Sequence, residues 1–139
     1  MEDIKKNRKT KILAIGDVHG DTGLVKKLAQ KAEKENVDLI ILAGDLTFAE
    51  TSLKGIIGPF AKAKKDVLII PGNHESISTV HFLSEMYKPY AKNLHGYYFK
   101  KGDLGIFGSG GTDIGIHWMP DKEIFENLKR GHKGIKDAK

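Results

Sequence analysis

The chain has 139 residues, a formal charge of +5 and no cysteine. We expect one domain over residues 1–139, which would bury about two-thirds of its unfolded surface. The absence of cysteine excludes disulfides and thiolate chemistry, so any metal ligands must be nitrogen and oxygen atoms. Apolar runs are shorter than the roughly 18 residues of a membrane span, and no signal-peptide core is recognisable. These features favour a cytoplasmic protein without a membrane partner.

The lysine and arginine excess lies near the two ends of the chain. We expect residues 1–10 and 132–139 to be basic, solvated tails around a nearly neutral body. An alternative is a nucleic-acid-binding module that uses these ends. Otherwise nucleic acid is expected only as a substrate, and the sequence predicts no oligomeric state.

Three uninterrupted apolar runs, 12–16, 39–43 and 67–70, predict parallel strands covered on both faces. Apolar residues at steps of three and four predict helices over 22–32 and 53–61, with a break or restart at Pro59, and over 76–86. A glycine-containing turn joins 97–100 to 104–107 as a hairpin, and a last helix follows the glycine-rich segment 108–111. The expected helix caps are Asp21 or Thr22, Ser76 or Ser78, and Asp121.

Polar residues follow each of the three strands, in the segments 16–20 (GDVHG), 44–45 (GD) and 72–75 (GNHE). Right-handed crossovers bring the carboxyl ends of parallel strands to one edge of a sheet, where ligands bind. Taken singly, these residues could also cap a helix, form a tight turn or bind backbone amides. Together, they predict a cluster of metal-type ligands, which are Asp17, His19, Asp45, Asn73 and His74.

These segments resemble the first three motifs of the calcineurin-like metallophosphoesterases. The segment 108–111 and the helix after it resemble the smaller prokaryotic members of that family, so the likeness extends over most of the chain. The resemblance implies an α/β sandwich of two mixed β-sheets flanked by helices. It also implies that Asp17 and His19 hold one metal ion, Asp45 bridges two, Asn73 binds the second, and His74 faces the scissile phosphate.

Family members continue with a strand ending in histidine and a Gly-His-x-His motif, which together supply three more ligands. The segment 131–134 (GHKG) has glycine where the second histidine would stand, so we expect His132 to be only a cation at a helix end. His117 could substitute as a ligand, although a partly buried or surface histidine is the simpler interpretation. We therefore expect the fold to be incomplete at the C-terminus.

The expected function is metal-dependent hydrolysis of a phosphomonoester or phosphodiester by a metal-activated hydroxide at a two-metal site. The donor set admits two divalent ions, Mn, Fe, Zn, Ni or Co with Mn favoured, and the second site could be empty or weak. His74 would stabilise the equatorial oxygens or protonate the leaving group. The alternative is a catalytically weak or inactive form of the same scaffold that binds metal or phosphate.

Overall fold

Four parallel strands form the central sheet of the computed structural model, which describes residues 8–51 and 53–138. The strands are β1 (Ile12–Ile15), β2 (Leu39–Ala43), β3 (Asp66–Ile70) and β4 (Ala91–Asn93), and they lie in the order β1-β2-β3-β4. The helices that connect them are α1 (Thr22–Lys34), α2 (Gly58–Lys62) and α3 (Ile77–Met86). The carboxyl ends of all four strands therefore lie along one edge of the sheet.

Side chains alternate strictly between the two faces of β2 and β3. Ile40 and Leu42 belong to the larger apolar cluster, which includes buried residues of α1, α2 and α3. Leu39 and Leu68 belong to a smaller cluster on the opposite face, with Phe99 and other residues of a hairpin. Because both faces are covered, the central strands are continuous apolar runs, as predicted.

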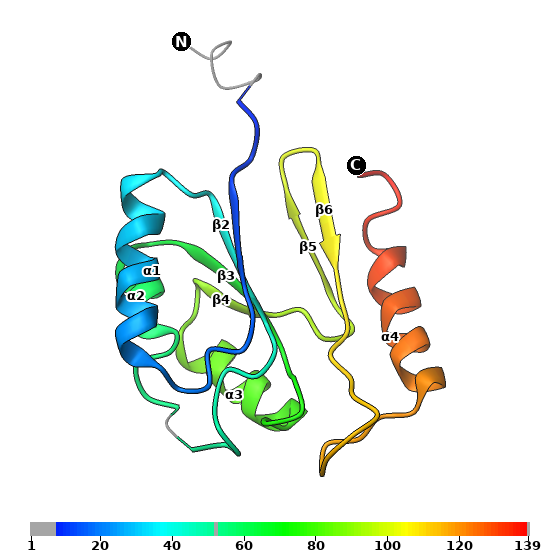
Figure 1. Cartoon of the computed structure of the whole chain (residues 1–139). Helices are drawn as coiled ribbons and strands as arrows, with labels where there is room; N and C mark the ends of the chain where they lie inside the picture. The colour runs from blue at the N-terminus through cyan, green and yellow to red at the C-terminus, as the bar shows by residue number, and fades with distance from the viewer. Residues whose placement is uncertain (1–7, 52, 139) are drawn as a thin grey trace.

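The hairpin consists of β5 (Tyr98–Lys101) and β6 (Leu104–Phe107), joined by two residues of which Gly102 has a positive φ of 58°. It lies across the sheet from α1 and α2, and α4 (Asp121–Lys133) lies beyond it (Figure 1). The α/β class and the two-sheet arrangement are confirmed. Neither sheet is mixed among the described residues, because helix crossovers make the first parallel and a two-residue turn makes the second antiparallel.

Two strands differ from the prediction. β1 lies at the edge of the described sheet and is covered on only one face, since its alternate residues Ile12 and Ala14 are exposed. β4 was not predicted, since its three residues, Ala-Lys-Asn, contain no apolar run. It forms because pairing with residues 67–69 of β3 satisfies its backbone.

Helix boundaries also differ in part. Asp21 and Ser76 cap α1 and α3 as predicted, each accepting a backbone N–H through its side chain. Helix α2 begins only at Gly58, so the predicted restart at Pro59 is confirmed, but the turn before it is not helical. Asp121 is the first residue of α4 and not its cap, which is Pro120. None of the helices in the described residues is long and apolar enough to cross a membrane.

The expected basic tails are attached to the body where they are described. Arg8 donates a hydrogen bond to Asp38, and residues 1–7 lie outside the described residues. At the other end, α4 extends to Lys133, and Ile135 is buried against Gly105 of the hairpin. The segment 132–138 is therefore not a detached tail, because an apolar side chain anchors it.

His95 links the hairpin region to α4. Its Nδ1 accepts the Gly110 N–H at 2.9 Å, and its Nε2 lies 3.2 Å from Nδ2 of Asn127. Burial lowers the pKa of His95 below its usual value of 6.5. As the pH falls through 6.5, this histidine takes up a proton in the unfolded chain before it does so in the folded chain, so acid destabilises the fold.

We expect Leu42→Ala to lower the free energy of unfolding by about 2–5 kcal/mol, because it opens a cavity in the core. Leu42 is fully buried, whereas Leu24 is 39% exposed. Leu24→Ala is the matched control and should cost clearly less. Urea denaturation measures both, and equal losses would contradict the assignment of the core.

We also expect stability to fall as pH drops from about 7.5 to 5, with His95 contributing no more than about 1.4 kcal/mol per pH unit. His95→Asn should flatten this dependence, since the buried base is removed. Urea denaturation across the pH series measures the difference. Parallel curves for the two proteins would show that His95 is not the group responsible.

Candidate metal centre

The turns after β1 and β2 are joined by backbone hydrogen bonds. The His19 N–H donates to the Asp45 carbonyl oxygen, and the Gly20 N–H donates to the Leu46 carbonyl oxygen, both at 2.9 Å. Two segments that are distant in the sequence therefore run side by side at the sheet edge. This pairing places the first two predicted motifs next to each other.

Three predicted site residues have left-handed backbone conformations. The φ angles are 54° at Asp17, 48° at His19 and 51° at Asp45. Asp and His adopt this region more often than most residues, but it still costs roughly 1–2 kcal/mol per residue. Strained non-glycine residues of this kind cluster at functional sites, where the surrounding structure holds them in place.

Asp45 is held by the backbone of the turn after β3. Its Oδ1 accepts the N–H groups of Asn73 at 2.9 Å and of His74 at 3.3 Å. Gly72 allows this approach, since a Cβ at that position would lie 2.1 Å from Asp45 Oδ1. The glycine before Asn73 is therefore required for the third turn to reach the second.

The side-chain amide of Asn73 lies against the Asp45 carboxylate. One of its terminal atoms lies 3.0 Å from both carboxylate oxygens of Asp45. If that atom is nitrogen, it donates to both oxygens, which is the favoured orientation without an ion. If it is oxygen, three oxygen atoms converge, and a cation among them would stabilise the arrangement. The oxygen orientation is therefore the one in which Asn73 and Asp45 fit a divalent ion.

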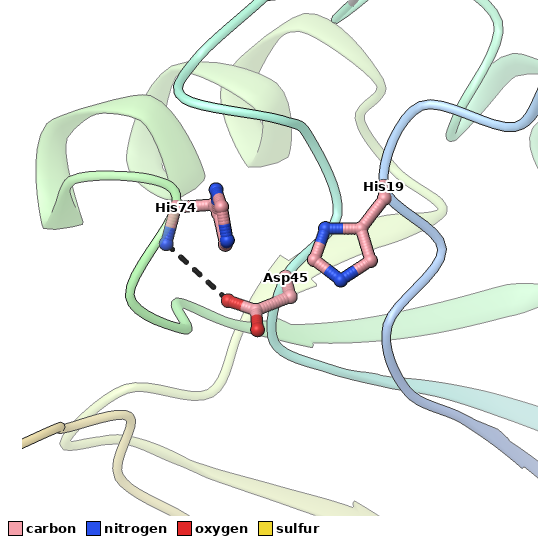
Figure 2. A group of neighbouring side chains, drawn as sticks. All are labelled: His19, Asp45 and His74. Atoms are coloured by element: carbon pink, nitrogen blue, oxygen red, sulfur yellow. Dashed lines mark hydrogen bonds between the residues drawn. The ribbon is translucent and has the colours of Figure 1, made fainter.

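Two imidazoles complete the group. His19, Asp45 and His74 each offer a ligand atom, and these atoms lie within 4.8 Å of one another. The two rings are nearly perpendicular, with centroids 4.9 Å apart. Figure 2 shows them flanking the Asp45 carboxylate from two sides. With Asn73, the structure therefore brings four of the five predicted residues together.

Asp17 lies at the outer side of this cluster. Its side chain is 77% exposed, and its Oδ1 is 3.7 Å from Nε2 of His19. Its role as a ligand stays a prediction. The other histidines considered lie elsewhere: His132 is exposed on α4 with its ring against Phe107, and His117 lies in the 111–119 segment. Neither joins the ligand group found among the described residues.

The profile of the calcineurin-like phosphoesterases matches residues 10–135 of the sequence. The chain belongs to this family. No curated protein matches the sequence significantly.

Two solved structures have a fold similar to that of this chain. The crystal structure of TT1561 of Thermus thermophilus has a TM-score of 0.76 and 19% identity, covering 94% of this chain and 65% of that chain. A second solved structure has a TM-score of 0.67 and 14% identity, covering 85% of this chain and 62% of that chain. The chain therefore spans slightly less than two-thirds of both similar proteins.

Glu75, the last residue of the third motif, supports the candidate site through buried hydrogen bonds. It is fully buried, and its Oε1 accepts the N–H groups of Leu46 at 3.1 Å and Gly72 at 3.0 Å. Its Oε2 finds no hydrogen-bond partner among the described residues. The carboxylate therefore ties the β2 turn to the β3 turn, a role that the sequence motif alone does not reveal.

The loop 47–51, which follows the second motif, was also missed. The Glu50 N–H donates to the His74 carbonyl oxygen at 2.9 Å, and the Glu50 carboxylate accepts from the Ser76 N–H and the Thr79 hydroxyl. The Thr79 hydrogen bond is the main reason why the pKa of Glu50 is lowered to about 2. No motif marks this loop, since its role depends on contacts with the start of α3.

A pocket of about 350 Å³ lies beside the turn after β3. The segments 71–78 and 111–119 line it, including Gly72 of the third motif and the exposed Trp118. A Cβ placed on Gly115 of the second segment would lie 3.8 Å from the Cβ of Asn73. The pocket is lined by residues on either side of Asn73 and His74 in the chain, and not by the candidate site residues themselves.

We expect Glu75→Ala to lower the free energy of unfolding by about 2–4 kcal/mol, because it leaves buried N–H groups without an acceptor. Glu126→Ala, at an exposed position of α4, is the control and should change stability little. Denaturation in urea measures both. A small effect at Glu75 would mean that the two turns hold together without its carboxylate.

Proposed function

We propose that this chain is a metal-dependent phosphoesterase that hydrolyses a phosphomonoester or phosphodiester. The observation that carries the proposal is the convergence of His19, Asp45, Asn73 and His74 at the carboxyl edge of the sheet. Membership of the calcineurin-like phosphoesterase family supports the same activity. The proposed setting is the cytoplasm.

The proposed ligands are Asp17, His19 and Asp45 for one divalent ion, and Asp45 and Asn73 for a second. When bound, two such ions would lower the pKa of a water molecule and neutralise charge on the phosphate. Only two of these ligands are carboxylates, so the loaded site would remain positive and attract an anionic ester. The mixed nitrogen and oxygen donors suit Mn, Fe, Zn, Ni or Co, and we favour Mn.

His74 is proposed to contact the substrate phosphate from beside the ligands. Its ring faces the same small volume as the Asp45 carboxylate (Figure 2). The adjoining pocket would take the organic part of the ester. Asp45 is prevented from swinging away because two backbone amides of the β3 turn hold it.

The proposal is tested with the 139-residue chain and Asp45→Asn, which keeps the shape of the side chain but removes its charge. We expect the variant to lose bound Mn²⁺ and to hydrolyse an aryl phosphate at least about 100-fold more slowly, because the shared ligand is weakened. Metal analysis and phosphate release measure the two effects. Asp103→Asn, in the exposed hairpin turn, is the matched control.

Hydrolysis that is unaffected by Asp45→Asn would contradict the proposed role of this carboxylate. Mn²⁺ binding without hydrolysis by the wild-type chain would instead favour the catalytically weak form of the scaffold. Comparing an aryl phosphate monoester with a diester distinguishes the two substrate classes.

A further inference from the structure

Two residues of the loop 47–51 contact the ring of His74. The backbone N–H of Ala49 donates a hydrogen bond to Nδ1 of His74 at 3.1 Å. The ring of Phe48 stacks on the imidazole, with centroids 5.1 Å apart and planes 30° apart. The imidazole is therefore restrained both at one nitrogen and across one face.

The hydrogen bond from Ala49 determines where the ring hydrogen of His74 lies. A nitrogen that accepts a hydrogen bond carries no hydrogen, so in the neutral ring the hydrogen lies on Nε2. A hydrogen on Nδ1 would point at the Ala49 N–H, and two donors would then oppose each other. Nε2 is then the ring nitrogen of His74 that remains free of this contact with Ala49.

The loop is itself held in place. Glu50 binds the start of α3 through Ser76 and Thr79, and its backbone N–H binds the His74 carbonyl oxygen. Ala49 and Glu50 have positive φ angles of 49° and 62°, which the surrounding contacts must stabilise. The Ala49 N–H is therefore a fixed donor and not a contact of a freely moving loop.

We propose that the loop 47–51 holds His74 as the neutral Nε2–H tautomer, so that His74 donates a hydrogen bond to a phosphate oxygen of the substrate. In this role His74 neither binds metal nor transfers a proton, and Phe48 is a positioning residue. The inference about the phosphate rests on the proposed function. A fixed donor aimed at developing negative charge stabilises the transition state without reorganisation during the reaction.

The tautomer is tested first, on the metal-free chain labelled with ¹⁵N at its histidines. Long-range proton–nitrogen correlation at about two pH units above the usual imidazole pKa of about 6.5 distinguishes Nε2–H from Nδ1–H. We expect His74, assigned by its absence from His74→Gln, to be the Nε2–H form. An Nδ1–H form or an even mixture would overturn the inference, whether or not the chain hydrolyses phosphate esters.

The role of His74 in the reaction is tested with aryl phosphates whose leaving phenols differ in pKa. We expect His74→Ala to lower kcat by about 10²- to 10³-fold for every member of the series, because a donor to a non-leaving oxygen is lost. His74→Gln should recover part of this loss through its amide N–H. A loss that grows with the pKa of the leaving phenol would show proton transfer and overturn the assigned role.

Phe48 is tested against an aromatic residue of equal exposure. Phe48 is 61% exposed and Phe125, on α4, is 62% exposed. We expect Phe48→Ala to lower kcat by about two- to tenfold with a smaller change in KM, and Phe48→Tyr to restore it, because stacking orients the ring. Phe125→Ala should leave kcat unchanged. Equal effects of the two alanine variants would refute positioning by Phe48.

Failure of this inference and failure of the proposed function give different results. Absence of metal-dependent hydrolysis by the wild-type chain would count against the phosphoesterase proposal. The tautomer of His74 and its change in Phe48→Ala are read without metal or substrate. A wild-type Nε2–H signal that broadens or shifts in Phe48→Ala, but not in Phe125→Ala, would support the positioning role.

Discussion

The hydrogen bonds from two successive backbone amides of the β3 turn to the Asp45 carboxylate organise the candidate site. They can form only because the β3 turn comes very close to Asp45, an approach that leaves no room for a side chain at Gly72. The same approach brings Asn73 and His74 beside the carboxylate. The buried carboxylate of Glu75 stabilises this close approach, because it accepts a hydrogen bond from one backbone N–H of each turn. Ligand geometry and fold stability are therefore coupled at one point.

The layers of the fold explain why this point is rigid. Helices cover one face of the sheet and the hairpin covers the other, so β2 and β3 are almost completely buried up to the turns (Figure 1). Side chains placed at the ends of such strands are held more precisely than side chains on long loops. The left-handed conformations of His19 and Asp45 are tolerated because the turns bind each other. The rigidity of the sheet thus supports local strain at the site.

Local sequence patterns predicted the three turns that meet at the candidate site, because each turn contains a glycine and follows a continuous apolar run. They did not predict β4, whose three residues become a strand only by pairing with β3. The exposure of β1 was also missed, since an apolar run is the same at an edge as in the middle of a sheet. Glu75 was part of a recognised motif, yet its hydrogen bond with Leu46 depends on a turn 29 positions earlier.

The sequence by itself determined three of the four strands of the sheet, the hairpin and the order of the helices, the residue types of the candidate site and the family. These follow from short-range periodicity and from short motifs of neighbouring residues. Only the tertiary structure decided how His74 is held, because Ala49 lies 25 positions away and contributes a backbone N–H that any residue type except proline would provide. The residue type at a position does not reveal whether its backbone N–H donates such a hydrogen bond. Its partner becomes visible only when the two loops are placed together.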